Sequence, residues 1–185
     1  LKVAKHGNRT ATGKSGSADF LEAAGINLKK SSDNFSNSLD KIGLGFLFAQ
    51  NHHPGMKYVM DARKILGKKT IFNLLGPLSN PAGANIQSIG VFHNKWIKPV
   101  AEALRNLNCK AAAIFHSDDG LDEISFTSTT QMIELFQNKL TNHEIDPKDF
   151  NIKSKNISDL EIESPQESVN KVIDTFENKF LAGKE

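Results

Sequence analysis

The stretch Lys5–Arg9 (KHGNR), followed closely by Gly13–Asp19 (GKSGSAD), sets the arrangement that we expect for the rest of the chain. It places three cations, a histidine, an amide and three glycines between an expected strand and an expected helix. Glycines let backbone N–H groups approach an anionic ligand closely, and such a loop before a helix is a common phosphate site. The alternative is an exposed turn with solvated lysines, because Gly, Asn and Ser are ordinary turn residues. Residue types alone leave both interpretations open.

Composition describes a globular protein of modest net charge. The chain has 185 residues, of which 38% are hydrophobic and 24% charged, and its formal net charge is +2. Residues 1–30 hold six Lys or Arg against two Asp or Glu, whereas residues 141–185 hold six Lys against ten acidic residues. The positive excess therefore lies at the glycine-rich loop and favours an anionic ligand there. It is too small to indicate a nucleic-acid-binding surface.

The single cysteine, Cys109, allows no disulfide within the chain, which agrees with a reducing compartment and a cytoplasmic location. No apolar run approaches the length that spans a bilayer, so we expect no membrane partner. The chain begins without a methionine, and we therefore expect it to be a fragment.

Alternating strand and helix patterns predict an α/β fold with a mixed, mostly parallel sheet flanked by helices. We expect strands at residues 1–4, 45–49, 86–92, 110–116, 124–127, 132–136 and 140–145. We expect helices from Ser15 or Ser17 to about Ala24, and at residues 31–42, 54–66, 95–107 and 165–181. Residues 50–54 read as a polar turn, residues 151–164 as polar surface chain, and residues 70–81 as a helical start broken at Gly76-Pro77 and again at Asn80-Pro81.

An acidic loop, Ser117–Glu123 (SDDGLDE), directly follows the near-continuously apolar strand at 110–116. Ligands of open α/β sheets gather at the carboxyl ends of such strands. Clustered carboxylates suit Mg²⁺, which takes one or two of them together with water and substrate phosphate. The alternative is an acidic turn capped by its own side chains. The position after a buried strand favours the metal.

Two further segments have weaker chemical signals. His52-His53-Pro54 precedes a helix that carries Arg63, whose planar guanidinium suits a carboxylate ligand. Adjacent histidines rarely share a metal ion, and surface or packing roles are the commoner fate of such residues. Gly76 would let a planar ligand lie close to the backbone, although a helix end with proline stops explains the same pattern.

Five segments together resemble the anthranilate phosphoribosyltransferase family, in the family's order and with similar spacing. They are KHGNR at 5–9, KSGSAD at 14–19, FLFA through HPGM at 46–56, TIFNLLGPL with Asn80-Pro81 at 70–81, and DGLDEIS at 119–125. The resemblance implies transfer of phosphoribosyl from phosphoribosyl pyrophosphate to the amine of anthranilate, with release of pyrophosphate, in tryptophan biosynthesis. The tail of the chain is only loosely similar.

Carried over by position, the resemblance implies three sets of site residues. Lys5, Asn8 and Ser17 would bind phosphoribosyl pyrophosphate. His6, Asn8, His53, Arg63 and Gly76 would form the anthranilate side, with Arg63 pairing its carboxylate. Asp122 and Glu123 would hold Mg²⁺. No residue is assigned as a general acid or base, since the amine is already a nucleophile and catalysis would rest on positioning and charge stabilisation.

The resemblance also implies what surrounds this chain. We expect residues 1–185 to be a partial α/β phosphoribosyltransferase domain, inactive alone, whose helices at 54–80 pack with an N-terminal helical lobe upstream. The family's Gly-Thr-Gly-Gly-Asp loop is expected there too, and the complete protein is expected to be a homodimer. Gln50 stands where the family usually has Pro. Alternatives are a pyrimidine nucleoside phosphorylase of the same fold, or a non-catalytic paralogue that binds nucleic acid; the retained Asp122-Glu123 pair argues against the paralogue.

Overall fold

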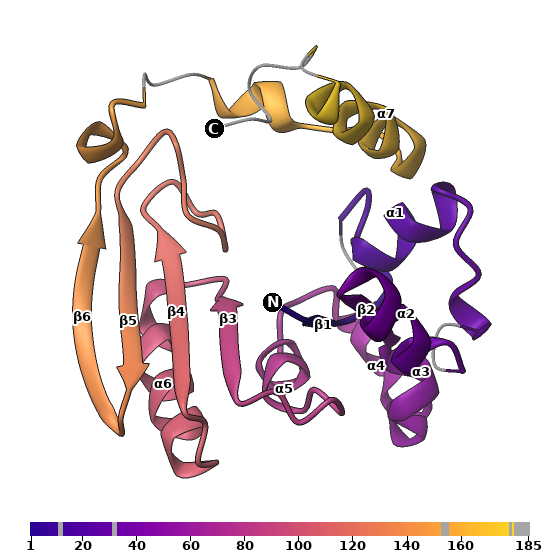
Figure 1. Cartoon of the computed structure of the whole chain (residues 1–185), viewed down its shortest axis with the longest axis horizontal. Helices are drawn as coiled ribbons and strands as arrows, with labels where there is room; N and C mark the ends of the chain where they lie inside the picture. The colour runs from indigo at the N-terminus through magenta and orange to yellow at the C-terminus, as the bar shows by residue number, and fades with distance from the viewer. Residues whose placement is uncertain (11–12, 31–32, 153–155, 178, 180–185) are drawn as a thin grey trace. The chain divides into compact units, whose positions relative to one another are not determined.

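A computed structural model describes residues 1–10, 13–30, 33–152, 156–177 and 179. The chain forms two compact units. The first comprises Leu1–Ala82 together with the C-terminal helix α7(Pro165–Phe176), and the second comprises Gly83–Leu160. Figure 1 labels the α-helices and strands of both units. None of the described helices combines the length and the apolar character needed to cross a membrane.

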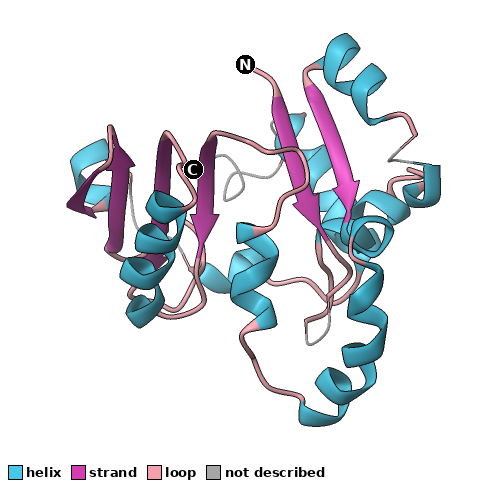
Figure 2. Ribbon diagram, turned by 90° about the horizontal axis from the view of Figure 1, so that it is seen from below, coloured by secondary structure: helices cyan, strands magenta, loops and turns pink. Residues whose placement is uncertain are grey.

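The first unit is built on two parallel strands. β1(Val3–Gly7) pairs with β2(Leu44–Phe48) in a register that joins Val3 to Leu44 and Gly7 to Phe48, and Figure 2 shows the two arrows pointing the same way. Around them lie α1(Ser17–Ala23), η1(Leu28–Lys30), α2(Phe35–Ile42), α3(Ala49–His52), η2(Pro54–Met56), α4(Lys57–Leu66), α5(Phe72–Leu78) and α7. Ala18, Leu28 and Phe48 form a buried apolar cluster against which Leu21 and Phe46 pack.

Four local predictions in this unit need correction. The first strand does not end at residue 4, because its pairing with β2 continues to Gly7. Neither Ser15 nor Ser17 caps α1; Gly16 precedes the helix, and the Asp19 carboxylate accepts its N–H at 2.8 Å. Residues 50–54 are not an open turn, because residues 49–52 form α3.

The fourth correction concerns Gly76-Pro77, where a break was expected but α5 continues to Leu78. Pro77 lies one residue before the helix end, so only a terminal hydrogen bond is lost. The Ser79 hydroxyl donates to the carbonyl of Leu75 at 2.8 Å and so satisfies one of the end groups. The expected helix start at Pro54 is confirmed as η2 leading into α4, and α4 ends before Gly67 as predicted.

The second unit is a four-stranded sheet in the order β3-β4-β5-β6. Its strands are β3(Ile86–Gly90), β4(Ala111–Ser117), β5(Thr130–Phe136) and β6(Lys139–Ile145), and its helices are η3(Asn94–Trp96), α6(Ile97–Asn106), η4(Pro147–Phe150) and η5(Ile157–Leu160). β3 and β4 are parallel, whereas β4–β5 and β5–β6 are antiparallel. The β5–β6 turn, Gln137-Asn138, has positive φ at both residues (48° and 64°), as tight hairpins require.

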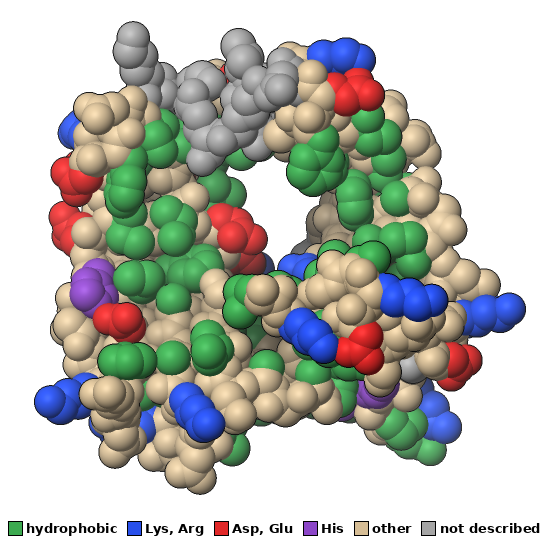
Figure 3. Space-filling model, viewed as in Figure 1, with side chains coloured by type: hydrophobic (Ala, Val, Ile, Leu, Met, Phe, Trp, Pro, Cys, Tyr) green, Lys and Arg blue, Asp and Glu red, His purple; other side chains and the backbone are tan. Residues whose placement is uncertain are grey.

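Helix α6 covers one face of this sheet (Figure 1). Its buried residues are Ile97, Val100, Ala101 and Leu104, and the sheet contributes Ala112, Ile114, Ile133 and Leu135. The opposite face carries exposed Ile86 and Phe136, which the register places beside Ala111, and Figure 3 shows apolar side chains over these strands. The segment 124–127 is not the expected strand, because Ser125 and Thr127 bond to the Asp119 side chain instead.

The mixed α/β class is confirmed. The described strands make two parallel and two antiparallel pairs. A mostly parallel sheet was expected, but in these strands the two kinds of pairing are equally frequent. Helix α7 begins at Pro165, as predicted, and the Ser164 side chain caps it. The helix ends at Phe176, earlier than the expected end at residue 181. The packing of residues 54–80 with another lobe stays a prediction.

Candidate active site

The carboxyl ends of β1 and β2 carry the first group of predicted site residues. Side chains alternate along a strand, so Lys5 and Gly7 point to one face of β1 and His6 to the other. The chain passes close to its neighbours at Gly7: a Cβ built there would lie 3.0 Å from the Phe46 ring and 3.6 Å from Ser17 Cβ. The sequence thus brings Ser17, at the start of α1, beside the end of β1.

His6 joins two segments that lie far apart in the sequence. Its Nδ1 lies 3.2 Å from the carbonyl oxygen of Gly76, which can only accept, so Nδ1 carries the proton. Its Nε2 lies 3.2 Å from Nε2 of His53, and the two rings meet edge to face at 67°. When His6 is neutral its Nε2 is an acceptor, and His53 therefore donates through Nε2–H. Three predicted residues form one contact group.

The surroundings of His6 favour its neutral form. Burial lowers the pKa of the His6 imidazole below 6.5, the bond to the Gly76 carbonyl opposes that shift, and the nearby His53 and His52 lower the pKa further. A neutral imidazole with a fixed tautomer is a directional hydrogen-bonding group rather than a cation.

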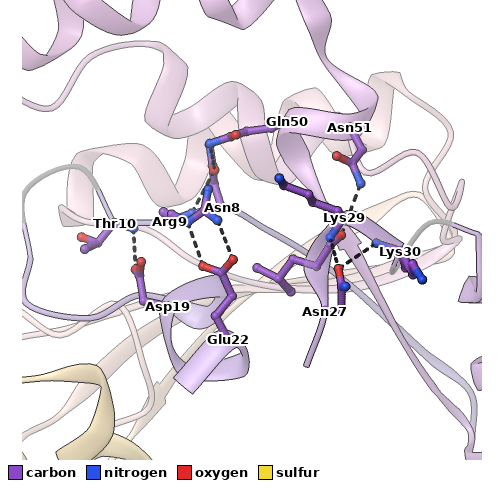
Figure 4. A network of polar contacts seen from close by, with 11 residues as sticks. Asn8, Arg9, Thr10, Asp19, Glu22, Asn27, Lys29, Lys30, Gln50 and Asn51 are labelled. Carbon is purple, nitrogen blue, oxygen red and sulfur yellow. Dashed lines mark hydrogen bonds and ion pairs between the residues drawn. The ribbon is translucent and has the colours of Figure 1, made fainter. Parts of the chain in front are cut away.

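Asn8 follows β1 directly and has a fixed amide. Its Oδ1 accepts the N–H of Arg9 at 2.9 Å and the Nε2–H of Gln50 at 3.4 Å (Figure 4). Because its oxygen is occupied, the Asn8 NH₂ group is the part presented as a donor. Gln50 is thus a neighbour of the site that sequence analysis noticed only as a departure from a family pattern.

The loop between Asn8 and α1 is closed by one carboxylate. Asp19 Oδ2 accepts the N–H of Thr10 at 2.9 Å and that of Gly16 at 2.8 Å, and the Thr10 hydroxyl accepts the N–H of Gly13 at 2.8 Å. This role of Asp19 was not predicted from the sequence. The signal was available, since an acidic residue three positions after a cap is the usual spacing of a capping box.

The three cations of the loop differ in their partners. Arg9 makes a two-pronged pair with Glu22, at 2.9 and 2.6 Å, and its guanidinium lies 5.0 Å from the centre of the Phe48 ring. The hydrogen bonds that Arg9 donates to Glu22 raise the pKa of Arg9. Lys14 pairs with Glu163. Lys5 is exposed, and no ion pair of Lys5 is found in the described part of the chain.

Arg63 lies on α4 and is half-buried. Its guanidinium carbon lies 5.7 Å from the centre of the Phe72 ring on α5. Among residues whose positions are described, no Asp or Glu pairs with it. An arginine held against an aromatic face with an unused fork is suited to a planar carboxylate.

Asp122 and Glu123 belong to the second unit, in the loop between β4 and β5. Both residues are exposed. The neighbouring Asp119 is tied into the loop: burial alone raises its pKa, but hydrogen bonds from Ser125, Thr127 and the Leu121 N–H outweigh burial and hold the pKa below its ordinary value. The Asp119 carboxylate is therefore engaged within the loop, and Asp122 and Glu123 are the candidates for ligand contact.

Known proteins match the chain over nearly its whole length. The model of the glycosyl transferase family a/b domain matches residues 1–184. An anthranilate phosphoribosyltransferase of Pseudomonas aeruginosa is 49% identical over 175 residues, which cover 95% of this chain and 50% of that protein. One from a Marinomonas species is 47% identical, with coverage of 91% and 49%. The chain thus spans about half the length of these relatives.

Solved structures of anthranilate phosphoribosyltransferases are also similar to this chain. The anthranilate phosphoribosyltransferase of Thermus thermophilus superposes with a TM-score of 0.83 at 34% identity, covering 97% of this chain and 53% of that one. The Saccharomyces cerevisiae enzyme in complex with PRPP and Mg superposes with a TM-score of 0.84 at 25% identity, covering 98% and 52%.

Proposed function

The chain belongs to the glycosyl transferase family of this a/b domain, and from that premise we propose that its complete protein is an anthranilate phosphoribosyltransferase of tryptophan biosynthesis. The reaction joins the anthranilate nitrogen to the anomeric carbon of phosphoribosyl pyrophosphate. The bond from that carbon to pyrophosphate breaks, and the amine loses a proton. The observation that carries the proposal is 49% identity, over 95% of this chain, to enzymes of that name.

The phosphoribosyl pyrophosphate side is proposed to comprise Lys5, Asn8 and Ser17. Lys5 has no described ion pair of its own, so its ammonium group is suited to an anionic ligand. The Asn8 amide presents its NH₂ as a donor because its oxygen already accepts from Arg9 and Gln50. Ser17 lies beside Gly7 at the start of α1. All three are donors, as phosphate oxygens require.

The anthranilate side is proposed to comprise His6, Asn8, His53, Arg63 and Gly76. The His6–His53–Gly76 contacts give this group a defined shape, and no Cβ at Gly76 fills the space beside it. Arg63 offers an unused planar fork to the carboxylate of the substrate. A neutral His6 adds no second cation that would compete for that carboxylate.

Asp122 and Glu123 fit a Mg²⁺ ion by their donor chemistry. Both offer hard carboxylate oxygens from an exposed loop. Over the described ranges, no three His, Cys, Asp or Glu side chains converge to form a complete metal cage. This suits Mg²⁺, which commonly takes one or two carboxylates and completes its shell with water and substrate phosphate. When bound, the ion would offset charge on the departing pyrophosphate.

Catalysis by these residues would rest on position and charge. The arginine and the histidine pair would hold the aromatic amine in place, and Lys5 would offset negative charge on the leaving group. A homodimeric state, a cytoplasmic location and the absence of nucleic-acid and membrane partners stay predictions.

The test of the assignment is a pair of substitutions at Arg63 in the complete protein. We expect Arg63→Ala to raise KM for anthranilate about tenfold or more, because a charged hydrogen-bond pair is lost, with less effect on KM for phosphoribosyl pyrophosphate. Arg63→Lys should recover only part of the loss, since it keeps the charge without the fork. Arg105→Ala on α6 is the control. Unchanged anthranilate kinetics in Arg63→Ala would remove Arg63 from the site.

A further inference from the structure

The loop that carries Asp122 and Glu123 is held by a set of hydroxyl and carboxylate side chains from outside the pair. We propose that Ser117, Asp119 and Thr130 are positioning residues that fix the backbone on both sides of Asp122-Glu123, and so set the two carboxylates for Mg²⁺. This inference rests on the proposed function. It goes further because it assigns roles to residues other than the two proposed metal ligands.

Ser117 and Thr130 form a hydrogen-bond chain whose direction is determined. Both side chains are fully buried, at 0% exposure. Ser117 Oγ lies 2.6 Å from the carbonyl oxygen of Glu123, which can only accept, so Ser117 donates there. Thr130 Oγ1, 2.7 Å from Ser117 Oγ, must then donate to Ser117. The same Thr130 oxygen accepts the N–H of Ser125 at 3.0 Å.

This chain ties down the backbone directly after Asp122. It runs from the Ser125 N–H through two hydroxyls to the Glu123 carbonyl, and each hydroxyl donates once. Buried hydrogen bonds in series polarise one another and are costly to break singly. Removing the Thr130 hydroxyl would leave a buried N–H without its acceptor.

Asp119 ties down the other side. Its Oδ1 accepts the N–H of Leu121 at 3.3 Å, and the Leu121 carbonyl accepts the N–H of Ser117 at 2.9 Å. Its Oδ2 accepts from Ser125 Oγ at 2.5 Å and also from Thr127 Oγ1. Asp119 therefore links the residue just before the carboxylate pair to the segment that follows it.

Gly90 on β3 lies directly against the backbone of Asp122. A Cβ built at Gly90 would lie 1.7 Å from the carbonyl oxygen of Asp122, so the loop backbone sits directly against this strand. The backbone around the two carboxylates is thus held at Leu121, Asp122 and Glu123. Mg²⁺ demands near-ideal octahedral geometry, and fixing its ligands before it binds lowers the entropy lost on binding.

The experiment measures phosphoribosyl pyrophosphate binding to the complete protein by calorimetry, in Mg²⁺ and in EDTA. The dissociation constant in EDTA divided by the dissociation constant in Mg²⁺ gives the factor by which the metal strengthens binding. Thr130→Val removes the hydroxyl, and Thr130→Ser keeps it. We expect Thr130→Val to lower the ratio about tenfold, as indirect support of metal ligands usually does, and Thr130→Ser to restore it. Thr141→Val on β6 is the control with an exposed threonine.

A loss of stability alone would not change the ratio, because both measurements use the same folded protein. Should Thr130→Val fold poorly, the half-buried Thr127→Val and Thr127→Ser pair repeats the test at Asp119. The positioning role alone would be overturned if the valine variants keep the wild-type ratio while the double variant Asp122→Asn with Glu123→Gln has a lower one. A wild-type ratio in that double variant would overturn the proposed Mg²⁺ site and this inference with it.

Discussion

At the scale of single residues, His6 shows how a site acquires its chemistry from its neighbours. The family resemblance was sufficient to list His6, His53 and Gly76, but not to show that they touch. Their contacts fix the His6 tautomer and keep the ring neutral. The consequence is a dependence of stability on pH.

Because the pKa of His6 is lowered in the folded protein, folding favours the neutral ring. The contribution of this group to stability is fully present above its ordinary pKa of 6.5 and is lost as pH falls below that value toward the folded pKa. We expect the free energy of unfolding of wild type, from urea titrations, to fall below pH 6.5. His6→Gln should flatten this part of the curve. An identical pH dependence in both proteins would contradict the assignment.

Gly90 gives a second prediction at this scale. Gly90→Ala places a methyl carbon only 1.7 Å from the carbonyl oxygen of Asp122. We expect the free energy of unfolding to fall by about 2 kcal/mol or more, since the loop must move. Gly55→Ala is the matched control, because nothing lies within 4 Å of a Cβ at Gly55. The free energies of unfolding of both variants are measured by chemical denaturation. Equal values would contradict the prediction, because the loop would then move without a loss of stability.

At the scale of elements, the sequence predicted most strands and helices but placed several boundaries wrongly. The apolar runs that became β2, β3 and β4, and the periodic stripe of α6, follow from local patterns. The end of β1 depends on pairing with β2, about forty residues away in the chain. The residues at 124–127 read as strand, yet their hydroxyls bond to Asp119. Such long-range polar contacts are not visible in a local pattern.

The link between the Asn8–Gly16 loop and α1 is testable by substitution. Asp19→Ala removes the acceptor of two backbone N–H groups, those of Thr10 and Gly16. We expect a loss of about 1–2 kcal/mol in the free energy of unfolding, as for other lost helix caps. Asp40→Ala breaks only the exposed pair with Lys2 and should cost less than about 0.5 kcal/mol. Similar losses in the two variants would refute the role of Asp19.

At the scale of the whole molecule, fold class and family membership were predictable, because five motifs occur in register along one chain. The division into two units was not, since no composition shift marks the boundary near residue 83. The predicted site residues likewise divide between the units: Asp122 and Glu123 lie in the second, and the other seven lie in the first. Local sequence patterns predict neither the boundary between the units nor the distribution of the site residues between them.

Helix α4 gives a prediction for the chain of residues 1–185 alone. Tyr58 and Ile65 on this helix are 79% and 85% exposed, and Leu66 is 58% exposed. Apolar side chains gathered on one exposed helix promote association. We expect sedimentation velocity to show self-association of this chain, reduced by Ile65→Lys. A monodisperse wild-type sample would contradict this prediction.

The central claim is tested most directly by following the fluorescence of anthranilate with the complete protein. The account predicts that anthranilate disappears only when phosphoribosyl pyrophosphate and Mg²⁺ are both present, with one pyrophosphate released for each anthranilate consumed. It predicts that Asp122→Ala combined with Glu123→Ala abolishes this turnover. Anthranilate left unchanged by the wild-type protein, or phosphorolysis of a pyrimidine nucleoside in its place, would contradict it.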